Sequence, residues 1–171
     1  MARQQSSVPA ILPFEYVALG RPFSAQNRTS GFNSWRQRLD EIVGGQIAST
    51  SGGHGFLPTP ELLRILIVWL SAQPDADDHP DLDAIIKPLI DAMSEDAGKN
   101  RPHPTYSWLI KNDRQIRRLE AAKINLNAPN LRLPDYVSDE QDKPEWARGE
   151  VVYVRMDRLA AADDLVWEWW K

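Results

Sequence analysis

Residues 62–70, Leu-Leu-Arg-Ile-Leu-Ile-Val-Trp-Leu, form a nearly uninterrupted apolar segment in which Arg64 is the one charge. The β-branched and aromatic residues in its middle favour a strand over a helix. Continuous rather than alternating apolar character is typical of a strand that is buried on both faces of its sheet. The segment therefore predicts a central strand, around which the other elements must supply cover on both sides.

Other periodic segments supply the remaining elements. Alternating or β-rich stretches predict further strands, apolar residues spaced three to four apart predict helices, and the resulting order is β-α-β-α-β-β-β followed by a terminal helix. This order indicates an α+β fold with one mixed sheet and helices packed on it. The predicted strands are residues 14–19, 62–70, 108–110, 117–126 and 150–156, and the predicted helices are residues 32–47, about 85–93 and 157–171.

The length of 171 residues fits a single domain with a genuine core. Residues 1–13 are polar at their start and are expected to be flexible. Residues 127–149 hold three prolines and many acids with little periodicity, so we expect a long acidic loop there. The tryptophan-rich residues 157–171 are expected to form a C-terminal helix that packs on its own chain, with partner or dimer contacts as the alternative.

Composition narrows the functional classes. The absence of cysteine excludes disulfides and thiolate metal sites and is compatible with a reducing cytosol. No signal peptide is evident, and the longest apolar run is too short to span a bilayer, so we expect a cytoplasmic protein without a membrane partner.

Charge is distributed unevenly along the chain. The net charge of −4 argues against indiscriminate binding to nucleic acid. Residues 75–96 hold one basic and eight acidic side chains, whereas residues 97–124 hold seven basic and two acidic ones. An acidic pocket flanked by basic segments suits a metal-dependent phosphodiesterase, although solvated helix faces would produce the same counts.

The acidic stretch contains a compact motif, residues 79–92, in which Asp81 and Asp83 precede an apolar run with helical spacing. Because Pro88 has no N–H and is best tolerated in a first turn, regular helix is expected to begin near Ile85. The two acids would then lie on the lead-in to the positive end of the helix.

Asp113, about thirty residues further on, offers a third carboxylate. Carboxylates converging from two segments are a plausible site for a hard cation, since Mg²⁺ binds through oxygen ligands, waters and substrate phosphate. The alternative is that an aspartate before the helix is its N-cap, which explains one member of the pair and not the other.

Three segments of the chain resemble one known family. These are Asp-x-Asp-x-Ile-x-Lys-Pro-Leu-x-Asp-Ala at residues 81–92, Asn-Asp-x-Gln-Ile at residues 112–116, and Gly-Arg-Pro-Phe-Ser-Ala-Gln-Asn-Arg at residues 20–28 with Trp35 beyond. Together they resemble the RusA family of Holliday junction resolvases, and the resemblance spans roughly residues 14–126. It implies a RusA-like fold and a homodimer that cuts four-way DNA junctions with Mg²⁺, for which Mn²⁺ can substitute.

By position, the resemblance implies metal binding by Asp81, Asp83 and Asp113, and catalysis by these acids with Lys87. Asp91 and Asn112 would support the site. Two departures bear on activity and metal affinity. Ala84 stands where the family usually has asparagine, and Asn112 stands where the family usually has the first of two acids.

Basic and amide side chains near these motifs are candidates for contacts with phosphates. Each arginine taken singly is also compatible with an ordinary solvated surface charge. The candidates are Asn27, Arg28, Arg36, Arg38, Lys99, Arg101, Arg114, Arg117 and Arg118.

The sequence thus favours a Mg²⁺-dependent endodeoxyribonuclease for branched DNA in recombination and repair. A four-way junction has local two-fold symmetry, which a C₂ homodimer would match. Two alternatives remain open. One is a junction- or DNA-binding protein of the same fold with impaired catalysis, which Ala84 and Asn112 favour, and the other is a nuclease for flaps or RNA.

Overall fold

The computed structural model describes residues 7–24, 30–74, 80–94, 109–128 and 150–159, and every structural statement below refers to these residues. The described elements, in chain order, are β1 (Ser7–Pro9), β2 (Phe14–Leu19), α1 (Ser30–Thr50), β3 (Gly55–Leu57), β4 (Leu63–Ser71), α2 (Leu82–Asp91), the 3₁₀ helix η1 (Asp113–Gln115), β5 (Ile116–Asn125) and β6 (Glu150–Arg158).

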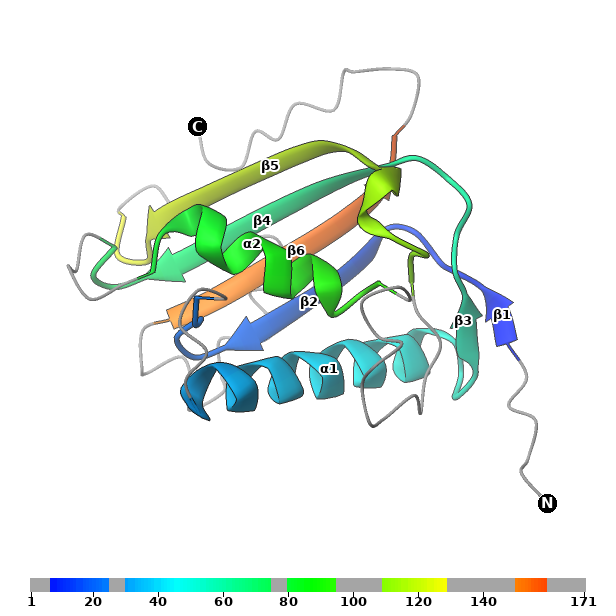
Figure 1. The fold of residues 1–171 in the computed structure, drawn as a ribbon, viewed down its shortest axis with the longest axis horizontal. Coiled ribbons are helices and arrows are strands. Elements are labelled where there is room, and N and C mark those ends of the chain that lie inside the picture. The colour runs from blue at the N-terminus through cyan, green and yellow to red at the C-terminus, as the bar shows by residue number, and fades with distance from the viewer. Residues whose placement is uncertain (1–6, 25–29, 75–79, 95–108, 129–149, 160–171) are drawn as a thin grey trace.

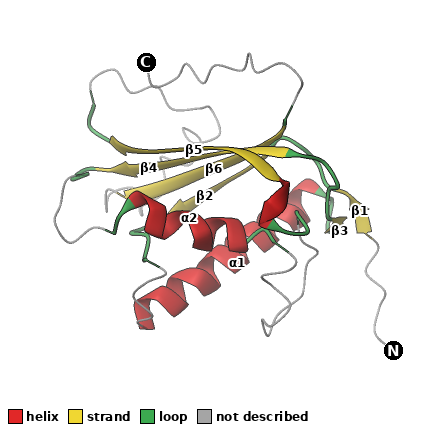
Figure 2. Cartoon of the chain, turned by 45° about the horizontal axis from the view of Figure 1, so that its top comes forward, coloured by secondary structure: helices red, strands yellow, loops and turns green. Residues whose placement is uncertain are grey.

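The main sheet has the strand order β2-β6-β4-β5, and both α-helices lie on one of its faces (Figures 1 and 2). β6 is antiparallel to both β2 and β4, whereas β4 and β5 are parallel. The sheet is therefore mixed, and the predicted α+β single domain is confirmed. A separate two-stranded sheet pairs β1 with β3 in parallel.

β4 is the central strand that its sequence predicts. All nine of its residues are buried, and it lies between β6 and β5 in the sheet. Ile65, Ile67 and Trp69 join the core that packs beneath the helices. Leu66 and Val68 belong to a second buried cluster on the opposite face.

The ends of the sheet determine where the motif residues lie. Val151, near the start of β6, pairs with Leu19 at the end of β2 and with Leu70 near the end of β4. We call this end of the strands, where β2, β4 and β5 finish and β6 begins, the Val151 end of the sheet. α2 begins at the Val151 end and runs back along the sheet, so that its C-terminus meets the start of β5 (Figure 1). There the Leu109 N–H donates to the Met93 carbonyl at 3.1 Å.

Helix α2 starts earlier than expected. It begins at Leu82 rather than near Ile85, and Pro88 lies inside it. The expected start followed from the hydrogen bond that proline cannot donate. The helix tolerates the missing hydrogen bond because Ile85, Pro88 and Leu89 form a buried face against the sheet. Their packing stabilises the helix by more than one backbone hydrogen bond would.

Other boundaries also differ from expectation. Residues 7–9, within the segment expected to be flexible, form β1, and residues 55–57, expected to be part of a loop, form β3. Asp157 does not begin a terminal helix, because β6 continues through it to Arg158. Ile110 makes isolated bridges with Thr59 and Ser94 rather than a strand. The remainder of the predicted C-terminal helix, residues 160–171, and the acidic loop from residue 129 onward lie outside the described residues.

Neither α1 nor α2 is long and apolar enough to cross a membrane.

Candidate metal and nucleic-acid site

The acid pair, Asp81 and Asp83, lies at the start of α2. Asp81 occupies the N-cap position with an extended backbone, but its side chain makes no capping hydrogen bond. Its main-chain carbonyl instead accepts the Ala84 N–H at 3.1 Å. Both acids are exposed, and neither carboxylate has a hydrogen bond or an ion pair with another described residue. The N-cap interpretation of Asp81 is therefore not realised, and both carboxylates are available to a ligand.

Lys87 lies one turn after Asp83 on the exposed face of α2. Its ammonium is 3.0 Å from the Asp91 carboxylate, while 68% of its side chain remains exposed. The pair is an i, i+4 pair in water and contributes only tenths of a kcal/mol, roughly 0.2–0.5. The ammonium of Lys87 therefore pairs with Asp91 rather than with Asp83, and it remains accessible.

Asp113 is exposed in η1 and lies away from the acid pair. η1 leads directly into the start of β5, next to the C-terminus of α2, whereas the acid pair lies at its N-terminus (Figure 1). The ten-residue helix α2, about 15 Å long, lies between the acid pair and the segment that leads to η1. Accordingly, the described residues contain no group of three acidic or histidine side chains that could hold a metal ion. Within one chain, Asp81 and Asp83 therefore lie together at the start of α2, and Asp113 does not join them.

Asn112 and Gln115 have structural roles that the motif alone does not disclose. The Asn112 side chain caps η1 by accepting the Arg114 N–H at 3.1 Å. The Gln115 amide accepts the Lys111 N–H at 2.8 Å and donates to the Glu61 carbonyl at 3.1 Å. These contacts fix η1 against the segment that precedes β4, and they leave the Asp113 carboxylate without a described partner.

Replacing Gln115 by alanine should therefore destabilise the protein. Several hydrogen bonds to main-chain groups are lost, and we expect a loss of about 1–3 kcal/mol in the free energy of unfolding, measured by urea denaturation. Arg114→Ala, at the exposed neighbouring position, is the matched control and should change stability by less than about 0.5 kcal/mol. Equal stability of the two variants would contradict the anchoring role of Gln115.

The candidate phosphate-binding residues are scattered. Arg114 and Arg117 are exposed near the start of β5, and Arg38 is exposed on α1, with Arg36 half-buried near it. Arg118 differs, because its guanidinium lies 2.8 Å from Glu120, which also pairs with the buried Arg64. Its charge is therefore partly compensated. Asn27, Arg28, Lys99 and Arg101 lie outside the described residues.

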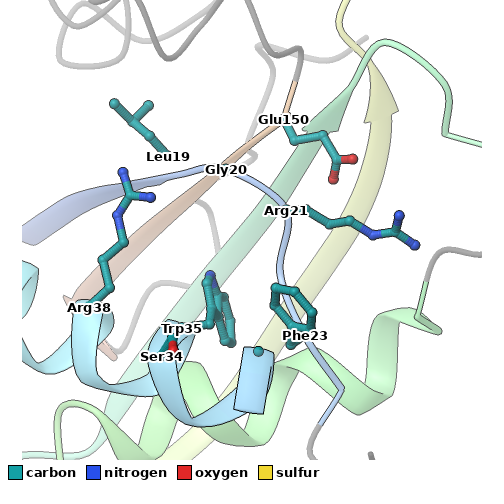
Figure 3. A pocket seen from close by; sticks show the side chains of 9 residues that line it. Leu19, Gly20, Arg21, Phe23, Ser34, Trp35, Arg38 and Glu150 are labelled. Carbon is teal, nitrogen blue, oxygen red and sulfur yellow. The ribbon is translucent and has the colours of Figure 1, made fainter. Parts of the chain in front are cut away.

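A pocket also opens at the Val151 end, between the end of β2 and the start of α1 (Figure 3). Its volume is about 450 Å³, and its lining includes Arg21, Phe23, Trp35, Arg38 and Glu150. The sequence indicated Arg38 as a candidate for phosphate contacts, and residues 20–28 and Trp35 belong to the segments that resemble the RusA family. Glu150 was not predicted, because nothing local in the sequence indicates that the first residue of β6 lies next to Gly20.

In comparisons with known proteins, the sequence matches no family model and no curated protein sequence. The likeness to the RusA family consequently rests on the motif residues and on their order along the chain.

Proposed function

We propose that the protein is a cytoplasmic, Mg²⁺-dependent endodeoxyribonuclease of RusA type that acts on branched DNA. The observation that carries this proposal is the acid pair: two exposed carboxylates, one residue apart at the start of α2, that neither cap the helix nor pair with a described residue. Acids that only stabilised the fold would be expected to make one of those contacts.

The acid pair fits Mg²⁺ in the chemistry of its ligands. This ion is usually held through one or two carboxylates, with waters and substrate phosphate completing its coordination. Asp81 and Asp83 would supply those carboxylates. When bound, Mg²⁺ provides the positive charge that makes a water a better nucleophile and offsets charge on the phosphate.

The chain's own groups would complete the site. The N-terminus of α2 presents backbone N–H groups and the positive end of the helix dipole, both of which favour a phosphate. The exposed ammonium of Lys87 would stabilise negative charge that develops on the phosphate oxygens during hydrolysis. Asp91, at 3.0 Å, would restrict the position of that ammonium.

A homodimer on a four-way junction is part of the proposal. The junction has local two-fold symmetry, and a C₂ dimer would present two acid pairs to two strands.

The second candidate function is a junction-binding protein that does not cleave. The separation of Asp113 from the acid pair favours it, since a site with two carboxylates holds Mg²⁺ less tightly than one with three. Ala84, next to the pair, removes a further polar contact.

The test is cleavage of a synthetic four-way junction by the full chain, with Mg²⁺, with Mn²⁺ and with EDTA, alongside a flap, a linear duplex and an RNA hairpin. The nuclease proposal expects metal-dependent cleavage with preference for the junction. Tight junction binding in EDTA without cleavage in either metal would instead establish the second candidate. Preferred cleavage of the flap or of the RNA hairpin would instead identify a flap nuclease or an RNA nuclease.

The placement of Asp113 gives a distinct prediction. Because η1 lies by the opposite end of α2 from the acid pair, Asp113→Asn should lower junction cleavage by no more than about tenfold, well below the effect of Asp83→Asn. The measurement is the single-turnover cleavage rate at saturating enzyme. An equal loss in Asp113→Asn and Asp83→Asn would mean that Asp113 does reach the acid pair. If the Asp113 of a second copy were the one that reaches it, mixed dimers of the two variants would regain activity.

A further inference from the structure

The pocket at the Val151 end has features that the proposed hydrolysis does not use. Its volume of about 450 Å³ is in the range of small-molecule sites. Two aromatic side chains and two arginines contribute to its lining, from α1 and from the segment that follows β2 (Figure 3). Aromatic faces and guanidinium groups together form the usual recognition set for a planar base that carries a phosphate.

Trp35 provides a hydrogen-bond donor at the pocket. The residue is only 5% exposed, and its indole Nε1 is buried without an acceptor among the described residues. In Figure 3 the nitrogen is at the edge of the ring that faces Gly20, across the pocket. Buried indole N–H groups usually have a partner, so an acceptor supplied by a ligand would remove a real cost.

The backbone shapes the aromatic wall. A Cβ atom on Gly31 would lie 2.7 Å from Phe23 Cε1, so the Phe23 ring packs directly against the bare backbone of α1. Phe23 remains 37% exposed. One part of its ring surface is thus fixed by Gly31, while another part is left for a further contact.

Arg38 offers a positive charge at the pocket. It has no hydrogen bond or ion pair with another described residue. Arg21 also lines the pocket, but its side chain points away from Arg38 (Figure 3). The first turn of α1, which contributes Gly31 to the lining, contains no acidic residue that would offset the helix dipole. An anionic group is therefore favoured. Glu150 lines the pocket as well.

We propose that this pocket binds a nucleoside phosphate, as the unpaired nucleotide of a DNA strand, with the base against Phe23 and Trp35 and the phosphate at Arg38. The choice of DNA rests on the proposed nuclease function. The pocket and the acid pair lie at the same end of the sheet, so a strand held by its unpaired base would pass its neighbouring phosphates near Asp81 and Asp83. Branched DNA offers unpaired or unstacked nucleotides that a continuous duplex does not.

The experiment measures binding in EDTA, by fluorescence anisotropy, of a labelled 12-nucleotide single strand, with a deoxynucleoside monophosphate as competitor and a blunt duplex as reference. Phe23→Ala should weaken binding of the single strand about tenfold, because it removes a stacking surface. Arg38→Ala should reduce the slope of log affinity against log salt by about 0.7, the loss of one phosphate contact to a single strand. Trp35→Phe, which keeps a ring and loses the N–H, should weaken binding about threefold.

Matched controls separate the pocket from general surface effects. Lys111→Ala removes an exposed charge outside the pocket lining, and Leu57→Ala removes an exposed apolar side chain in β3. Both should bind the single strand within twofold of wild type. The proposal is overturned if Phe23→Ala and Arg38→Ala match their controls, or if the duplex shows the same losses as the single strand. Competition by the monophosphate would show that the pocket accepts a free nucleotide. A lack of competition would show that the pocket requires a DNA strand.

The outcome is independent of cleavage. If the pocket variants weaken binding in EDTA but no metal-dependent cleavage is found, the nucleotide pocket stands and the proposed nuclease function is refuted. Cleavage that is lost in Asp83→Asn, combined with pocket variants that bind as their controls do, would leave the nuclease standing and refute the pocket.

Discussion

Asp83→Asn should abolish metal-dependent cleavage of a four-way junction, with a loss in single-turnover rate on the order of 100-fold or more. The amide keeps the size of the carboxylate but loses the charge and one metal-binding oxygen. Because Asp83 is exposed and its side chain contacts no described residue, the fold should be unaffected. Asp81→Asn should behave in the same way. Binding of the junction in EDTA should be unchanged or slightly tighter, because one negative charge near the phosphates is removed.

Glu41→Gln supplies the matched control, since Glu41 is exposed on α1 and only pairs locally with Gln37. It should cleave at the wild-type rate. Metal binding can also be followed without turnover, because Mg²⁺ should raise the thermal stability of the wild type and raise that of Asp83→Asn less. Full cleavage by both acid variants, in a sample that is folded, would place the chemistry elsewhere in the chain.

Ile67→Ala should cost about 2–5 kcal/mol in the free energy of unfolding, a large part of the roughly 5–15 kcal/mol that stabilises an ordinary domain. Ile67 is fully buried in the middle of β4, where its side chain joins the core beneath the helices. Truncation removes apolar contacts and leaves a cavity that two flanking strands prevent from closing. Urea denaturation measures the loss as a lower midpoint at an unchanged m-value.

Two further substitutions calibrate this result. Ile67→Val removes a single methylene at the same site and should cost about 0.5–1.5 kcal/mol. Leu57→Ala, at a side chain that is 54% exposed in β3, should cost distinctly less than Ile67→Ala. A loss for Ile67→Ala no greater than that for Leu57→Ala would mean that β4 is not the centre of the core.

The long elements were predictable because their own residues encode them. Continuous apolar character in residues 62–70 predicted a strand buried on both faces, and the confirmed β4 lies between two neighbours. Apolar spacing likewise predicted α1, and alternation predicted β2, β5 and β6 to within a few residues. Misplaced boundaries came from rules about single residues. Pro88 and Asp157 were read as signals for a helix start, whereas packing against the sheet and continued pairing along β4 determined their conformation.

The candidate site divides in the same way. Asp81 and Asp83 are one residue apart, so the sequence by itself determined that they lie together at the start of a helix. Only the tertiary structure decided that Asp113 lies at the opposite end of that helix, because α2 runs back along the sheet to connect the parallel strands β4 and β5. The same holds for the pocket, where antiparallel pairing of β2 with β6 brings Glu150 next to Gly20 across 130 residues of chain. Local spacing determines which side chains share a helix turn, whereas strand direction and register determine which ends of the elements meet.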